Sequence, residues 1–292
     1  MNKEDKCKDV DLTSLLGNLN NSDWSIQAKA IFDLKDSDNP DVLDALIQKL
    51  DDDNVNVWLS AIRVLKDKND PRIAEKLTRT LTEDERDEVR WHSAYYLGEI
   101  RNTEINIEPL INALKDKCAE VRVNAAKSLG KIGNRKAVDA LIKRLDDEDP
   151  IVRKEAMASL NTLSPSENVD DLIKSLDDAD KHVRSLAAIV IGKVGGEESV
   201  DKLVQTLSDE DSVVRVSAVY ALDKIGGDRV VDPLVNALKD SYWEVRSDAA
   251  SALGKMEDTR AVVPLLDVLK DENVFVRRSA SKALEKFSIF KK

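Results

Sequence analysis

Residues 116–130 read Asp-Lys-Cys-Ala-Glu-Val-Arg-Val-Asn-Ala-Ala-Lys-Ser-Leu-Gly, and this stretch decides the fold. Its Val-Arg pair returns along the chain, and successive arginines stand 32, 31, 31, 31, 31 and 31 residues apart. They are Arg90, Arg122, Arg153, Arg184, Arg215, Arg246 and Arg277. Counting back by the same interval reaches Trp58 and Gln27, where the arginine is replaced. A constant period of about 20–50 residues is typical of repeat architectures, so the sequence predicts nine repeats.

Each repeat predicts two helices. Residues 138–145 carry apolar side chains at i, i+3, i+4 and i+7, the pattern of a helix with one buried stripe, and the pattern returns at 169–176, 200–207, 231–238 and 262–269. A second helix follows each Val-Arg pair, where small alanines allow close packing. Because a two-helix unit buries its apolar face only by stacking on neighbours, we expect an all-α fold, a right-handed α-solenoid.

The repeats divide the chain without leaving room for another kind of domain. We expect a polar tail over residues 1–9 and a single solenoid domain over 1–292. The predicted repeats span residues 10–37, 38–68, 69–101, 102–133, 134–164, 165–195, 196–226, 227–257 and 258–292.

The ends of the helices also have sequence signals. An Asp or Asn stands four residues before the arginine position in six repeats and predicts a cap for the second helix: Asp23, Asn54, Asp149, Asp180, Asp211 and Asn273. We expect Gly133, Gly195 and Gly226 to close helices in the left-handed conformation. We also expect Trp24 and Phe32 to cover the first end of the stack.

These features resemble the HEAT-repeat superfamily (an armadillo-type fold), in the short prokaryotic form first described in phycobilisome lyases. The resemblance covers about Val10 to Phe287 and is carried by the Asp-x5-Arg spacing and the Ala-Ala-x-x-Leu-Gly ending of residues 116–130. It implies a ladder of ion pairs between adjacent repeats, in which a planar guanidinium bonds two carboxylates at once. The predicted ladder consists of Asp84, Arg90, Asp116, Arg122, Asp147, Arg153, Asp178, Arg184, Asp209, Arg215, Asp240, Arg246, Asp271 and Arg277.

The resemblance also implies that the second helices line a concave face. Side chains at i, i+3/i+4 and i+7 then form its exposed stripe. We predict partner-binding positions at Glu88, Trp91, His92, Tyr95, Glu99, Tyr220, Trp243, Arg278 and Lys282. Trp91, His92 and Tyr95 cluster in a chain with only 4% aromatic residues, and exposed Trp and Tyr are favoured interface anchors. The alternative is that Trp91 packs on Trp58 and fills the space of the missing arginine.

A recurrent lysine row has two interpretations. Its members could attract an acidic partner, or they could interact with the helix dipole near each helix C-terminus. The row consists of Lys131, Lys193, Lys224, Lys255 and Lys286.

Composition and motifs restrict the function. The net charge of −11 argues against a nucleic-acid partner, because nucleic-acid binders neutralise phosphates with a basic surface. Cys7, Cys118, His92 and His182 stand too far apart for a zinc motif, and we expect no metal, no cofactor and no catalytic residue. A chain without a signal peptide or an apolar run long enough to span a membrane is expected in the cytoplasm.

The sequence leaves three functions open. We expect a non-enzymatic scaffold or adaptor that binds a protein or peptide partner on the concave face. One alternative is a chaperone-like subunit of a phycobilin (tetrapyrrole) lyase, which the family resemblance implies. The other is a nucleic-acid-binding clamp.

Overall fold

The computed structural model describes residues 12–68, 70–100, 106–163 and 169–287. These residues form helices joined by short turns, and none of them lies in a β-strand. The all-helical repeat fold predicted from the sequence is thereby confirmed. The predicted tail at residues 1–9 lies outside the described residues. The chain divides into two compact units, residues 1–132 and 133–292.

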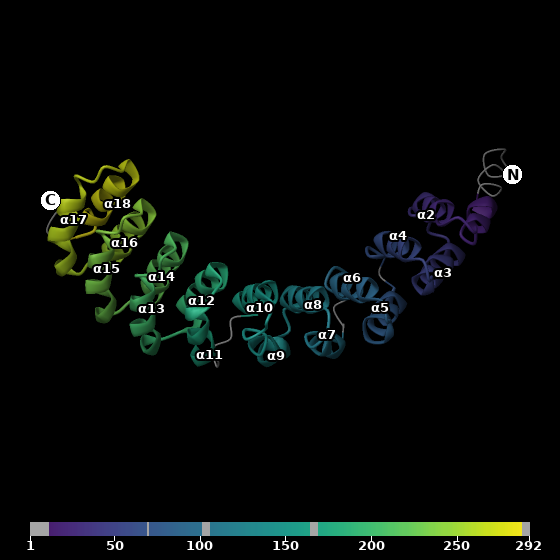
Figure 1. Cartoon of the computed structure of the whole chain (residues 1–292). Coiled ribbons are helices and arrows are strands. Elements are labelled where there is room, and N and C mark those ends of the chain that lie inside the picture. The colour runs from purple at the N-terminus through teal and green to yellow at the C-terminus, as the bar shows by residue number, and fades with distance from the viewer. Residues whose placement is uncertain (1–11, 69, 101–105, 164–168, 288–292) are drawn as a thin grey trace. The chain divides into compact units, whose positions relative to one another are not determined.

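The N-terminal unit consists of helix pairs. Residues 12–18 are helical, and the helices that follow are α2 (Trp24–Asp33), α3 (Pro40–Gln48), α4 (Val55–Leu65), α5 (Pro71–Glu83), α6 (Asp87–Leu97), α7 (Glu108–Ala113) and α8 (Ala119–Ile132). The second helices of the repeats, α2, α4, α6 and α8, contact one another in turn. Their first helices α3, α5 and α7 lie along the other side (Figure 1). We call the outer surface of α2, α4, α6 and α8 the second-helix face.

The C-terminal unit repeats this arrangement. Its helices are α9 (Val138–Ile142), α10 (Pro150–Leu163), α11 (Val169–Lys174), α12 (Lys181–Val194), α13 (Val200–Thr206), α14 (Ser212–Ile225), α15 (Val231–Ala237), α16 (Trp243–Met256), α17 (Val262–Val268) and α18 (Val274–Leu284). Short 3-10 turns lead into or out of several first helices, at Lys49–Asp51, Arg135–Ala137, Ser175–Asp177, Glu197–Ser199, Asp228–Val230 and Thr259–Ala261. The second helices α10, α12, α14, α16 and α18 again contact one another in turn.

Side-chain caps start the second helices where the sequence predicts them. The carboxylate or amide oxygen of each cap accepts a hydrogen bond from the main-chain N–H two residues further on, which satisfies a donor that the helix leaves free. The caps are Asp23, Asn54, Asp149, Asp180, Asp211 and Asn273. Their common spacing from the arginine position sets the same starting point for each second helix.

One of the three predicted left-handed glycines is not left-handed. Gly133 and Gly226 have φ of +75° and +67°, as a closing residue without a Cβ can adopt. Gly195 has φ of −77° and extended backbone, so the prediction is wrong there. At the end of the eighth repeat, Glu257 adopts the left-handed conformation with φ of +52°.

Close contact between second helices depends on small residues. Ala125, Ala187, Ala218 and Ala249 are fully buried. The glycine of the Leu-Gly ending lies at a crossing point, because a Cβ on Gly192 would come within 2.7 Å of the Ala221 Cα. This glycine allows two helices to pack backbone to backbone.

The predicted cover at the first end of the stack is not formed by Trp24 and Phe32. Their side chains are 46% and 59% exposed. Both lie on α2, and Phe32 belongs to the second-helix face.

Candidate functional site

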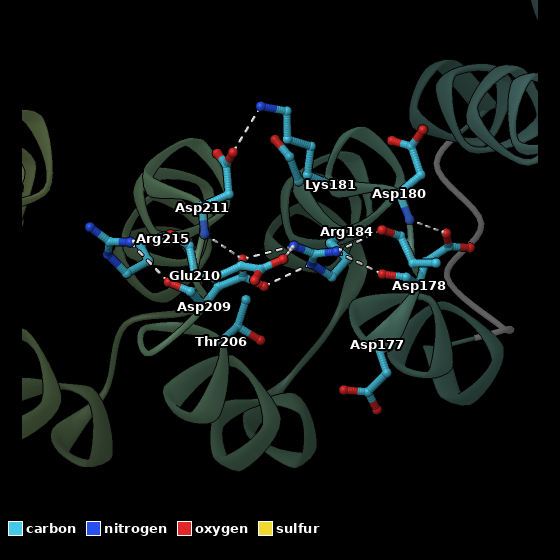
Figure 2. A network of polar contacts seen from close by, with 12 residues as sticks. Asp177, Asp178, Asp180, Lys181, Arg184, Thr206, Asp209, Glu210, Asp211 and Arg215 are labelled. Atoms are coloured by element: carbon cyan, nitrogen blue, oxygen red, sulfur yellow. Dashed lines mark hydrogen bonds and ion pairs between the residues drawn. The ribbon is translucent and has the colours of Figure 1, made fainter.

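The Asp–Arg ladder joins neighbouring repeats within each unit. Arg184 donates from Nε and Nη2 to the two carboxylate oxygens of Asp209 in the next repeat, at 2.8 and 2.9 Å (Figure 2). Its Nη1 donates to the main-chain oxygens of Asp178 and Ala179 in its own repeat, at 2.8 and 3.2 Å. Each arginine therefore fixes one repeat against the next with a planar, bidentate contact.

The same contact recurs elsewhere in the two units. The pairs are Arg90–Asp116, Arg153–Asp178, Arg215–Asp240 and Arg246–Asp271. The guanidinium of Arg246 holds the pKa of Asp271 below its ordinary value by hydrogen bonding to the charged carboxylate. We expected each guanidinium to bond the carboxylate of its own repeat as well. That expectation is wrong for the ladder aspartate of the same repeat, which offers its main-chain oxygen. Arg90 binds a different carboxylate of its own repeat, that of Asp87.

Three further members of the predicted ladder, Arg122, Asp147 and Arg277, have the following contacts. Arg122 donates to the main-chain oxygen of Asp116 at 2.9 Å, and Arg144 donates to the buried Asp147 at 3.3 Å. Arg277 donates to the main-chain oxygens of Asp271 and Glu272 in its own repeat.

Trp58 stands at the arginine position of the second repeat, and Arg86 supplies the guanidinium contact there instead. Arg86 donates from Nε and Nη2 to the carboxylate of Asp84, at 2.9 and 2.7 Å, and from Nη1 to the main-chain oxygen of Asp53 at 2.6 Å. A guanidinium thus links a carboxylate of the third repeat to a main-chain carbonyl of the second, as in the regular contacts. It comes from the third repeat, and α6 has no side-chain cap because Arg86 occupies the cap position.

The first repeat uses a two-residue relay. Gln27 stands at the arginine position and donates from Nε2 to the main-chain oxygen of Asn21 at 2.6 Å. Its side-chain oxygen accepts a hydrogen bond from Lys49, which also binds Asp52, both at 3.3 Å. A neutral amide and an ammonium together span the gap that one guanidinium spans elsewhere.

The predicted aromatic cluster lies on one face of α6. The rings of Trp91 and His92 stack with centroids 3.4 Å apart, and both side chains are half-buried. His92 Nδ1 lies 2.8 Å from the main-chain oxygen of Glu88, which is exposed. Tyr95 is half-buried one turn further along.

The ring that lies beside Trp58 is His92, at a centroid distance of 6.3 Å, and Trp58 itself is buried. The alternative expected Trp91 to pack on Trp58, and the neighbouring residue His92 makes this ring contact instead. Burial lowers the pKa of His92, and the nearby charge of Arg63 lowers it further. The hydrogen bond to Glu88 and the charge of that residue oppose this lowering but do not cancel it.

Tyr95 belongs to a row that crosses the whole second-helix face. The residue five positions after the arginine position is Phe32 on α2, Arg63 on α4, Tyr95 on α6 and Lys127 on α8. Phe32, Arg63 and Lys127 are exposed, and the Lys127 ammonium lies 5.8 Å from the centroid of the Tyr95 ring. We call these four residues the central row. Sequence reasoning read the aromatic cluster but missed Arg63 and Lys127, although the same position rule, applied to every repeat, identifies both.

Carboxylates border the central row. Glu88 and Glu120 are exposed near the starts of α6 and α8, and Asp36 and Asp67 are exposed beyond the ends of α2 and α4. Glu99 binds Lys131 of the next repeat, which holds the pKa of Glu99 below its ordinary value. The row therefore presents cations and rings between two acidic borders.

Most members of the lysine row have partners. Besides the Lys131 pair, Lys193 donates to the side-chain oxygen of Asn161 at 2.7 Å, and Lys255 binds Asp223 at 2.5 Å. Lys224 lies 5.5 Å from the centroid of the Tyr220 ring. These lysines connect second helices to one another or cover a ring, a role that neither sequence interpretation included.

A cavity of about 570 Å³ lies between α2 and α4 at one end of the central row. Phe32, Lys35, Arg63, Asp67 and Lys68 are among its lining residues. Lys35 covers the Phe32 ring at 4.2 Å, and Asp67 is paired with Lys66 at 2.8 Å. The cavity thus combines an aromatic wall with three cations and two carboxylates, Asp36 and Asp67.

The remaining predicted partner-binding residues lie in the C-terminal unit. Tyr220 is half-buried on α14, while Arg278 and Lys282 are exposed on α18. Trp243 is half-buried at the start of α16, with its ring centroid 5.3 Å from that of Phe275. These four residues belong to the C-terminal unit, whereas the α6 residues belong to the N-terminal unit.

The described part of the chain contains no group of three or more His, Cys, Asp or Glu residues arranged to hold a metal ion. It also contains no helix with the length and apolar character needed to cross a membrane.

Comparison with known proteins identifies the repeat. The model of the family described as HEAT repeats matches residues 12–98, 74–161, 107–182, 169–252 and 231–288. No curated protein matches the sequence.

Solved structures share the fold. YibA of Escherichia coli is 25% identical with a TM-score of 0.62, over 87% of this chain and 94% of that one. Kap121p is 14% identical with a TM-score of 0.63, over 94% of this chain and 37% of that one. The CpcE–CpcF complex of phycocyanin lyase from Nostoc sp. PCC7120 is 24% identical with a TM-score of 0.46, over 72% and 93%.

Proposed function

Because the chain belongs to the HEAT-repeat family, we propose that it is a non-enzymatic protein-binding scaffold whose second-helix face in the N-terminal unit binds a peptide segment of its partner. Stacked helical repeats provide extended surfaces suited to protein binding. The observation that carries the proposal is the central row with its neighbours Trp91 and His92. It places four aromatic or imidazole rings and two cations on four consecutive second helices.

The physical basis is the energy of aromatic and arginine anchors. Such residues dominate interface energies because they bury a large area with few rotatable bonds. Trp91 and Tyr95 are half-buried in the free protein, so their orientation is already restricted before a partner binds. A peptide that covers them therefore loses less conformational entropy on binding.

A random peptide library selected on the protein provides ligands for the test. Replacing Trp91→Ala and Tyr95→Ala together should weaken the selected peptides by more than about tenfold, a loss of about 1.4 kcal/mol or more. Fluorescence anisotropy measures the affinities, and the melting temperature of each variant is recorded on the same preparation.

The matched control changes the same two repeat positions in the C-terminal unit. Lys154 and the half-buried Ile189 stand one and five residues after their arginines, and Lys154→Ala with Ile189→Ala should leave affinity within about twofold, well under 1 kcal/mol. Ser185 is unsuitable as a control because it is buried against Ser217 at 2.8 Å. If the library yields no ligand, or the Trp91 and Tyr95 variant binds like the wild type, the proposal is wrong.

The two alternatives from the sequence stay predictions. Absorbance titration with a bilin or haem tests the tetrapyrrole alternative, since a bound chromophore changes its spectrum. Binding of a labelled oligonucleotide tests the alternative of a nucleic-acid-binding clamp.

A further inference from the structure

The central row alternates aromatic and cationic side chains from one helix to the next. Phe32, Arg63, Tyr95 and Lys127 come from four consecutive second helices and occupy the same position in each repeat. A carboxylate accepts charge-assisted hydrogen bonds from a guanidinium or ammonium, and an apolar side chain covers a ring. The row therefore distinguishes two kinds of ligand side chain in alternation.

The cavity between α2 and α4 adds an enclosed position for one carboxylate. Its wall contains the Phe32 ring together with Lys35, Arg63 and Lys68. The wall also contains two carboxylates, Asp36 and Asp67, of which Asp67 is paired with Lys66, so the three cations of the wall outnumber its acidic groups. Within the described residues, Arg63 has no carboxylate within 4 Å of its guanidinium, so an incoming carboxylate meets a cation that has no existing ion pair to break.

The spacing of the helices sets the spacing of the ligand groups. Neighbouring packed helices lie about 8–10 Å apart, so Arg63 on α4 and Lys127 on α8 are separated by roughly 16–20 Å. A peptide in the extended polyproline II conformation advances about 3.1 Å per residue with three residues per turn, so every third side chain faces the same way. This places about three residues on each helix and about six between the two cations.

We infer that the second-helix face of the N-terminal unit recognises an extended acidic peptide, with carboxylates about six residues apart on Arg63 and Lys127, one apolar side chain between them on Tyr95 and another before them on Phe32. This inference rests on the proposed function and specifies the chemistry of the partner segment.

The acidic borders select a peptide over a nucleic acid. Glu88, Glu120, Asp36 and Asp67 lie beside the row, and a phosphate at every nucleotide meets these carboxylates as well as the two cations. A peptide with two separated carboxylates carries fewer negative charges past these borders. Repulsion from like charges therefore weakens the nucleic acid more than the peptide.

The probe is a fluorescein-labelled peptide with leucine, glutamate, leucine, glutamate and leucine at every third position and serine between them. This pattern reads the same in both chain directions, so the test does not depend on the orientation of the bound peptide. The first comparison peptide has glutamine for both glutamates. The second has the same composition with the two glutamates adjacent, and a labelled oligothymidylate is the nucleic-acid probe.

We expect the spaced glutamate peptide to bind at least about tenfold more tightly than either comparison peptide, as a charge-assisted contact supplies. Arg63→Gln should remove this preference and leave the glutamine peptide unchanged within about twofold. Arg79→Gln makes the same charge change on α5, where Arg79 is exposed and bound to Asp51, and it should preserve the preference. Melting temperatures show that the variants are folded.

Several results would overturn the inference. They are equal binding of the glutamate and glutamine peptides, equal preference in Arg63→Gln, tighter binding of oligothymidylate, or no binding of the spaced peptide to the wild type. If library-selected peptides still require Trp91 and Tyr95 in that case, the proposed function stands and only the acidic-peptide inference fails. If selection also yields no ligand, both fail.

Discussion

At the scale of single residues, the ladder arginine has two kinds of acceptor. In Arg184, one edge of the guanidinium binds a carboxylate of the next repeat and the other edge binds main-chain oxygens of its own repeat. The side chains of Arg184 and Asp209 are only 10% and 11% exposed. Removing the arginine therefore leaves Asp209 without its cation, whereas Asp178 remains bound to Arg153.

Arg184→Ala should lower the free energy of unfolding by about 2–3 kcal/mol, between the cost of breaking a buried pair and that of a solvated one. Urea denaturation measures this loss, and selected peptides should still bind. An unchanged denaturation midpoint would show that the ladder does not stabilise the stack.

Arg86 provides a second test at this scale, since it supplies the guanidinium contact in the repeat where Trp58 stands at the arginine position. We expect Arg86→Ala to cost about 1 kcal/mol, because this pair is more solvated than that of Arg184. Arg79→Ala breaks an exposed pair with Asp51 and should cost under about 0.5 kcal/mol. If the Arg86 and Arg79 variants unfold at the same denaturant concentration, Arg86 is not a replacement for the ladder arginine.

At the scale of helices, the close approach of α12 and α14 depends on one glycine. A Cβ on Gly192 would lie 2.7 Å from the Ala221 Cα and 3.0 Å from its Cβ. Because the obstacle is backbone, neither side chain can rotate away, and the two helices must separate.

Gly192→Ala should therefore destabilise the protein by about 1–3 kcal/mol, the usual cost of overpacking. The control is Gly17→Ala, where a Cβ meets nothing within 4 Å on a helical residue. Helix propensity alone makes that control neutral or stabilising by up to about 1 kcal/mol. Thermal melts by circular dichroism compare the two, and a stable Gly192→Ala protein would contradict the packing argument.

At the scale of the whole molecule, the ladder makes the free energy of unfolding depend on pH. Hydrogen bonds from Arg86 and Arg246 lower the pKa of Asp84 and Asp271 below the ordinary value of 3.8. For Asp116 and Asp240, burial is the largest single influence and raises the pKa. The hydrogen bonds from Arg90 and Arg215, together with those from the main-chain N–H groups of Cys118 and Tyr242 and the nearby positive charges, lower the pKa by more. Below pH 4 the unfolded chain binds more protons than the folded one, so stability falls as pH decreases through the folded pKa values.

We predict that the melting temperature is nearly constant from pH 7 to about pH 5 and declines below about pH 4, as several ladder carboxylates become protonated together. Asp271→Asn should melt lower at pH 7 and lose less stability on acidification. A melting temperature that stays constant to about pH 3, or an equal decline in the variant, would show that the ladder does not set the acid response.

The sequence alone determined the helical repeat and the start of six second helices. The capping Asp or Asn and the apolar stripes depend on residues within a few positions of one another, and the 31-residue period repeats these local signals. Helical hydrogen bonds and caps join residues at most four apart, so these signals can be read without knowing the fold.

Only the tertiary structure decided which groups meet across repeats. Arg184 and Asp209 are 25 residues apart, and the rotation of one repeat on the next selects the carboxylate that each guanidinium binds. The replacement by Arg86, the relay through Gln27 and Lys49, and the alignment of Phe32 with Arg63 have the same origin. Side chains a full repeat apart become neighbours only when the helices stack, because contact then depends on helix packing rather than on distance along the chain.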